Sequence, residues 1–111
     1  MTITGEAIQG LQSRYGFTQP EIGLISGYAP RSIANWLKGT RPTPAARQKF
    51  VELRRLFTAL EGLVENPGEV KSWLNEPNSA FEGSTPRQVI ERGESDRLWH
   101  MIYFIESGQA G

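Results

Sequence analysis

The sequence of 111 residues contains no cysteine and only one histidine, His100. The absence of cysteine excludes a disulfide framework, a thiolate zinc site and a cysteine nucleophile, and it is typical of proteins that work in a reducing compartment. No apolar stretch approaches the roughly 18 residues of a membrane-spanning helix, and the N-terminal residues lack a basic run followed by an apolar stretch. We therefore expect a soluble, cytoplasmic protein that makes no contact with a membrane.

The chain also lacks net charge, because 12 Lys and Arg residues balance 12 Asp and Glu residues, and this balance argues at first sight against nucleic-acid binding. The charges are unevenly distributed, however. Up to Lys49 there are six basic and two acidic residues, a surplus of four positive charges, so the remainder carries four negative charges. One interpretation is a basic half that faces phosphates and an acidic half that faces another partner. The alternative is that so few surface charges differ by this much by chance.

Residues suited to catalysis are scarce. His100 lies in a predicted helix between two apolar residues, so a structural or interface histidine is a simpler interpretation than a general base. The carboxylates of Glu91, Glu94 and Asp96 cluster at a helix junction, where such groups usually cap N-termini. No glycine-rich phosphate loop and no metal-ligand spacing is present. We expect no enzymatic activity, no cofactor, no metal and no small-molecule substrate.

Glycine and proline divide the chain into helix-length pieces, and no stretch alternates β-branched with polar residues as a strand does. The length suits one domain, or two small helical modules that share a core. The sequence therefore predicts an all-α fold. Its expected helices cover about residues 4–15, 19–26, 30–39, 44–66, a short piece around 70–74, 86–93, and a last helix capped by Ser95 or Asp96.

The longest predicted helix begins at Pro44 after a cap at Thr43. Apolar residues with spacings of three and four form a stripe along it: Phe50, Leu53, Phe57, Leu60 and Val64. We expect most of the stripe to be intramolecular, because so short a chain cannot spare its largest apolar face, although it could also supply a dimer seam. The predicted division is a helix-turn-helix region with the long connecting helix in residues 1–65, and a small helical region in residues 66–111.

Residues 19–38 carry the pattern of a helix-turn-helix. Gly23 falls where two crossing helices approach closely, and Gly27 falls at the tight turn, where a positive φ is needed. Ile22, Ile33 and Trp36 fall where the two helices interlock around a small core. In this motif the second helix inserts its N-terminal end into the major groove. An αα-hairpin with solvated polar residues is the alternative, but the joint placement of these residues favours the helix-turn-helix.

The outward face of the second helix carries the predicted contacts to DNA. Arg31 can bridge guanine O6 and N7, and Asn35 can pair with adenine, each pair contributing about 1–3 kcal/mol of discrimination. Groups at the first helix N-terminus and just past the second helix usually meet phosphates. The predicted DNA-binding set is Thr18, Gln19, Pro30, Arg31, Ser32, Asn35, Lys38 and Arg41. The segment 32–39 resembles the Xre (Cro/C1-like repressor) helix-turn-helix family.

The stretch from Trp73 to Glu94 resembles the C-terminal domain of the MbcA/ParS/Xre antitoxins. That pattern is roughly W-L-x-x-P-N-x-x-F-x-G-x-T-P-x-x-x-I-x-x-G-E, followed by an amphipathic helix, and the similarity covers about residues 70–105. The matching residues look mainly structural: Trp73, Pro77, Phe81, Gly83, Thr85, Pro86, Gly93 and Glu94.

The resemblance implies a type II antitoxin that binds a RES-domain toxin, an NAD-degrading enzyme, and represses its own operon through the helix-turn-helix. Its implied partners are operator DNA and the toxin, as a homodimer or a toxin–antitoxin hetero-oligomer. Toxin contacts would come from the last helix and tail: Arg97, His100, Met101, Phe104, Glu106, Ser107, Gly108, Gln109, Ala110 and Gly111. Because the tail has no apolar anchor after Ile105, a plug in the toxin pocket would depend on backbone groups and the terminal carboxylate. The alternative is a stand-alone regulator whose C-terminal domain serves dimerisation.

Overall fold

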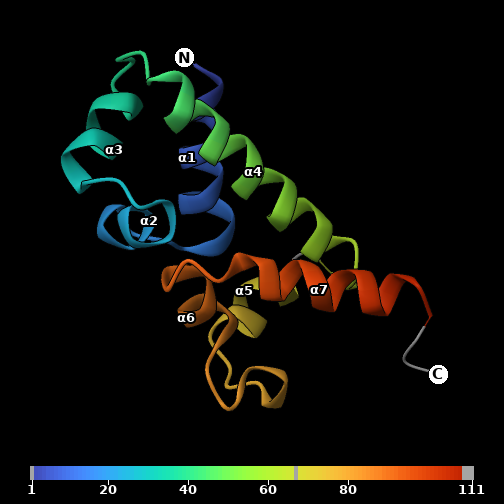
Figure 1. The fold of residues 1–111 in the computed structure, drawn as a ribbon. Coiled ribbons are helices and arrows are strands. Elements are labelled where there is room, and N and C mark those ends of the chain that lie inside the picture. Colours follow the sequence, from blue (N-terminus) through green and yellow to red (C-terminus); the bar gives the residue numbers. More distant parts are fainter. Residues whose placement is uncertain (1, 67, 109–111) are drawn as a thin grey trace.

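The computed structural model describes residues 2–66 and 68–108, and every regular element in that part of the chain is a helix (Figure 1). This confirms the predicted all-α class. In chain order the elements are α1 (Ile3–Tyr15), α2 (Gln19–Ser26), α3 (Pro30–Leu37), α4 (Pro44–Glu61), α5 (Gly68–Leu74), the 3₁₀ turn η1 (Ser79–Phe81), α6 (Pro86–Glu91) and α7 (Ser95–Glu106). Across the described residues, none of these helices combines the length and apolar character needed to cross a bilayer.

Side-chain caps mark the start of α1, α2, α4 and α6. The Thr18 hydroxyl accepts a hydrogen bond from the Glu21 N–H, and the Glu21 carboxylate accepts one from the Thr18 N–H, so α2 starts with the predicted capping box. Thr43 caps α4 in the same way by accepting from the Ala46 N–H, with Pro44 in the first turn. These starts coincide with the predicted ones because the cap and the proline are both local signals.

Four predicted boundaries are wrong, among them the end of α6, which lies at Glu91 and not at residue 93. The helix α4 ends at Glu61, not Asn66, because Gly62 is its C-cap and the chain turns there. The helix α3 ends at Leu37, since Gly39 adopts a φ of 110°. Neither Ser95 nor Asp96 caps α7, because Glu94 occupies the N-cap position and directs its carboxylate to the guanidinium groups of Arg92 and Arg97.

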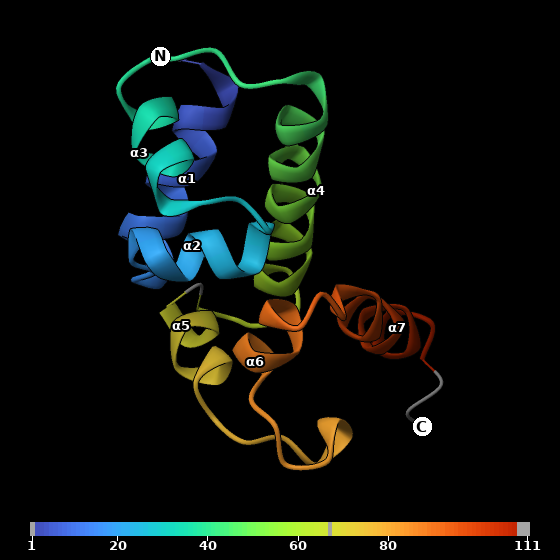
Figure 2. The ribbon, with the colours of Figure 1, turned by 60° about the vertical axis from the view of Figure 1, so that its left-hand side comes forward.

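The helices form an elongated body of 47 × 24 × 23 Å (Figures 1 and 2). At one end α1, α2 and α3 pack with the N-terminal part of α4. The long helix α4 leads from this bundle toward the other end, where α5 and α6 lie beside α1 and α2. The last helix, α7, contacts α4 and α6 and then leads outward to the C-terminal end of the chain. Its final turns therefore project from the body of the molecule.

One buried core runs through both predicted regions. Four of the five residues in the α4 stripe are buried within the chain, namely Phe50, Leu53, Phe57 and Leu60, and Val64 is half-buried beyond the helix end. The core continues without interruption into residues Val70, Leu74, Phe81, Val89, Ile90, Leu98 and Ile102. The stripe is therefore intramolecular, as expected, and the regions 1–65 and 66–111 share their apolar interior.

Candidate functional site

The turn between α2 and α3 depends on two glycines. A Cβ atom on Gly23 would lie only 2.7 Å from the backbone carbonyl oxygen of Tyr28, so no larger residue fits there without a backbone shift. Gly27 ends α2 with a φ of 82°, a conformation that costs glycine little. Ile22 and Ile33 are fully buried where the two helices cross. The sequence prediction of close approach at Gly23 and positive φ at Gly27 is confirmed.

The outer face of α3 is open to solvent. Pro30, Arg31 and Asn35 are exposed on it, and Ser32 is half-buried. Trp36 lies inside, as expected, with its ring edge-on to Phe50 at 5.9 Å between centroids. The N-cap residue Ala29 provides no side-chain acceptor, so the first N–H groups of α3 receive no cap. The helix can therefore approach another molecule with its N-terminal end and this polar face.

The remaining residues predicted to contact DNA lie around this face. Lys38 follows directly after α3, and Arg41 lies in the loop that leads to α4; both are exposed. At the start of α2, Thr18 is exposed and Gln19 is half-buried. All eight predicted positions therefore lie at the surface of the α1–α3 bundle or in the loop that follows it. Six of them are exposed, and Gln19 and Ser32 are half-buried.

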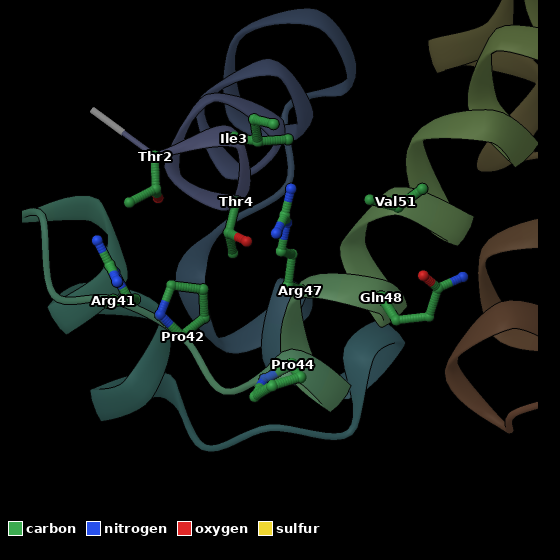
Figure 3. A pocket seen from close by; sticks show the side chains of 9 residues that line it. All are labelled: Thr2, Ile3, Thr4, Arg41, Pro42, Pro44, Arg47, Gln48 and Val51. Atoms are coloured by element: carbon green, nitrogen blue, oxygen red, sulfur yellow. The ribbon is translucent and has the colours of Figure 1, made fainter.

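A groove of about 720 Å³ separates the N-terminal end of α1 from the loop before α4 and the start of α4 (Figure 3). Arg47 reaches along this groove from α4, whereas Arg41 stands on the loop at its other side. The basic surface thus includes Arg47, which the sequence analysis did not select, although its place in the first turns of α4 was available as a signal. The full lining is Thr2, Ile3, Thr4, Arg41, Pro42, Pro44, Arg47, Gln48 and Val51.

A second exposed feature is apolar and lies at the end of α7. The side chains of Tyr103, Phe104 and Ile105 are 64%, 51% and 45% exposed. Leu98 and Ile102 of the same helix are buried, whereas Ile105 is exposed because the last turn of α7 extends past the body of the molecule. Tyr103 was not selected as a contact residue, although the aromatic character of this helix indicated it.

An apolar groove of about 190 Å³ adjoins this end of α7. It lies between the end of α4, α5 and α7, and it is lined by Leu60, Leu63, Val64, Val70, Trp73, Met101 and Ile105. Ile105 belongs both to the groove and to the exposed turn, so the two features meet at this residue. Large unpartnered apolar surfaces on soluble proteins usually mark interaction sites.

The residues predicted to contact a toxin have different environments. Arg97 bonds both carboxylate oxygens of Glu82, at 2.9 and 2.8 Å, and the carboxylate of Glu94 at 3.3 Å. It therefore joins η1 to α7 and has a structural role whatever else it contacts. His100, Phe104, Glu106, Ser107 and Gly108 are exposed, and Met101 is half-buried. Gln109, Ala110 and Gly111 lie outside the described residues.

The described residues lack the arrangement of side chains that a metal ion requires. No cluster of three or more His, Asp or Glu side chains within residues 2–66 and 68–108 is arranged to hold a metal ion. The hydrogen bond from the Thr18 backbone, with a smaller contribution from Arg87, lowers the pKa of Glu21 below its ordinary value. This carboxylate is therefore ionised at neutral pH and is used to cap α2 and to form an ion pair.

Comparisons with known proteins agree over almost the entire chain. No family model matches it. It is 27% identical over 109 residues to the mycobacterial cidal antitoxin MbcA of Mycobacterium bovis and of Mycobacterium tuberculosis, with 97% of this chain and 96% of the relative covered. A chain in the crystal structure of the M. tuberculosis MbcT–MbcA toxin–antitoxin complex matches with a TM-score of 0.69 and 27% identity, covering 97% of both chains.

Proposed function

Because the chain is homologous to the antitoxin MbcA from end to end, we propose that it is the antitoxin of a toxin–antitoxin pair. The observation that carries this proposal is the match in sequence and in fold, over 97% of the chain, to a protein crystallised with its toxin. The match includes both the α2–α3 unit and the C-terminal helices. A relative that shared only a helix-turn-helix would support DNA binding alone.

The toxin-binding surface in this proposal is the apolar end of α7 with the adjoining groove. Interfaces concentrate their binding energy in a few aromatic and other large side chains. This end of α7 presents two of them, Phe104 and Tyr103, which both stay more than half exposed although the Tyr103 ring stacks on Trp99. His100, Met101 and Glu106 extend the surface along the same helix, and the tail residues Ser107 and Gly108 follow. The motif resemblance further implies a RES-domain toxin that degrades NAD, and we include that partner in the proposal.

The second part of the proposal is that the chain represses its own operon through α3. The exposed face with Arg31 and Asn35, the uncapped N-terminal end of α3 and the surplus of positive charge before residue 50 support this role. A pseudo-palindromic operator requires two such helices about 34 Å apart, so DNA binding would involve two copies of the chain or a hetero-oligomer with the toxin.

Neutralisation of the toxin is the direct test. The chain is co-expressed with the protein encoded by the neighbouring gene, and growth and complex formation by pull-down are measured. Deletion of residues 104–111 should abolish both rescue and complex formation, since it removes the exposed end of α7. A shorter deletion of residues 107–111 separates the tail from the helix: rescue lost only with the longer deletion assigns inhibition to α7. Full rescue by the longer deletion would contradict the proposed surface.

DNA recognition is tested with Arg31→Ala and Asn35→Ala. Each substitution should weaken binding to the operator by about 1–3 kcal/mol and leave binding to random DNA nearly unchanged, because these side chains are assigned to base edges. Lys38→Ala is the matched control, since loss of a phosphate contact weakens binding to both DNAs alike. If Arg31→Ala lost the same affinity for operator and for random DNA, Arg31 would contact a phosphate and not a base edge. DNA binding without any toxin binding would instead support a stand-alone regulator.

A further inference from the structure

An ion pair joins the C-terminal helices to the start of the helix-turn-helix. The guanidinium Nη1 of Arg87, in the first turn of α6, bonds the carboxylate Oε2 of Glu21, in the first turn of α2. The two residues are 66 positions apart in sequence. Their side chains are only 16% and 29% exposed, and α2 and α6 pack directly against each other. The pair is therefore part of a packed contact between helices.

Packing fixes the position of the Arg87 side chain. Its guanidinium carbon lies 4.6 Å from the centroid of the Phe17 ring, which is itself buried against Phe57. The Nε atom of Arg87 is buried and makes no hydrogen bond within the described residues. A cation that is stacked on an aromatic ring and paired with a carboxylate gains from both contacts. Arg87 therefore cannot leave Glu21 without also giving up its contact with Phe17.

The position of Glu21 gives this pair its significance. Its Oε1 atom accepts the Thr18 N–H at 2.9 Å, so the carboxylate stands at the N-terminal end of α2. Thr18 and Gln19, the proposed phosphate contacts of α2, occupy the same end. An uncompensated carboxylate beside a DNA phosphate is repelled by it, whereas a carboxylate paired with a guanidinium carries little net charge.

We propose that Arg87 is a positioning residue for DNA binding, which neutralises and holds the Glu21 carboxylate so that the start of α2 can approach a phosphate. This inference depends on the proposed DNA-binding function of the helix-turn-helix. It places a residue needed for operator affinity in the region assigned to toxin binding. Without α6, the helix-turn-helix of residues 1–65 would then carry an unpaired Glu21 carboxylate at the start of α2.

The test compares Arg87→Gln, Glu21→Gln and the double variant in the full-length chain. Dissociation constants are measured on operator and on random duplex DNA at several salt concentrations. Arg87→Gln should weaken binding to both DNAs by about five- to tenfold at low salt, and by less at high salt, because the repulsion it exposes is electrostatic and independent of sequence. The double variant should recover to within about twofold of the natural chain, since glutamine keeps the capping box while removing the charge.

Arg92→Gln is the matched control. It removes the same charge from the same region, but Arg92 bonds Ser84 and Glu94 and not α2. Its effect on DNA binding should be less than twofold. Should Arg87→Gln fail to fold, Glu21→Gln alone carries the test, because removal of the carboxylate should tighten binding by about threefold at low salt.

Each other outcome overturns the inference. Unchanged DNA binding by Arg87→Gln, or a double variant as weak as Arg87→Gln, would show that Arg87 acts through packing or not at all. A Glu21→Gln chain that binds no more tightly, although its Arg87 charge is then uncompensated, would show that charge at this position does not act on the DNA. Failure of the natural chain to bind any operator DNA would instead reject the proposed helix-turn-helix function, and this inference with it.

Discussion

A single missing methyl group determines how closely α2 and α3 can approach. The Cβ of an alanine at position 23 would lie 2.7 Å from the carbonyl oxygen of Tyr28, and a backbone atom cannot rotate away as the end of a side chain can. The sequence predicts the close approach from the place of Gly23 in the helix-turn-helix pattern, together with Gly27, Ile33 and Trp36. It could not supply the identity of the opposing atom, because Tyr28 O is brought there by the turn.

Gly23→Ala should therefore destabilise the protein by about 1–3 kcal/mol, the usual cost of forcing extra volume into a packed site, and should weaken operator binding. Denaturant unfolding measures the loss. The matched control is Gly10→Ala in the middle of α1, where a Cβ meets nothing within 4 Å and should stabilise the helix by about 0.5–1 kcal/mol. Equal stability of Gly23→Ala and the natural chain would mean that the crossing can widen freely.

At the scale of elements, a buried phenol ties the end of α1 to the end of α4. The Tyr15 hydroxyl donates a hydrogen bond to the Glu61 carboxylate, and the Tyr15 ring stacks on Phe57 at 4.6 Å. Burial, reinforced by the neighbouring carboxylate, raises the pKa of Tyr15 well above its ordinary value of 10.0. The folded chain thus holds the proton more tightly than the unfolded chain.

The stabilisation due to this proton is complete below pH 10 and is lost as the pH rises above 10, because only the unfolded chain then releases the proton readily. Tyr15→Phe should cost about 1.5–3 kcal/mol at pH 7, the range for a hydrogen bond to a charged group. The difference in free energy of unfolding between the two chains should shrink between pH 9 and pH 11, as urea titrations would show. A constant difference across that range would contradict the assignment.

Local sequence signals predicted most helices, but they could not predict contacts between residues that lie far apart in the sequence. Thr18, Thr43 and the prolines that follow helix caps are adjacent to what they determine, so the predicted starts of α2, α3, α4 and α6 are correct. The early end of α4 and the exposure of Ile105 depend on where other helices stop, which no local pattern contains. The pairing of Arg87 with Glu21 could not be predicted for the same reason, because the two residues are 66 positions apart. Exposure of Arg31 and Asn35 follows from helical periodicity, whereas their contacts with DNA remain predictions.

At the scale of the whole molecule, the continuous core makes the two regions depend on each other for folding. Helices α5, α6 and α7 cover parts of α1, α2 and α4 that would otherwise face water. Loss of such apolar cover costs roughly 25 cal/mol for each Å² exposed. The predicted boundary near residue 65 therefore does not divide the buried core, which continues on both sides of it.

A fragment of residues 1–65 should accordingly lack a cooperative unfolding transition, while the full chain unfolds in one step. Thermal unfolding followed by circular dichroism, and by tryptophan fluorescence, measures both. In the full chain the two signals should coincide, since Trp36 reports on one region and Trp73 and Trp99 on the other. A cooperative transition in the fragment would show that the helix-turn-helix region folds independently.

The shared interior also limits how such a protein can evolve. A gene fusion that transplanted residues 66–111 onto an unrelated repressor would leave the graft without the surfaces of α1, α2 and α4 that complete its interior. The exposed outer turns of α7, in contrast, can vary by point substitution without disturbing the interior. Transfer of either region as a whole module, the common route in proteins with separable domains, would expose apolar surface that the other region covers.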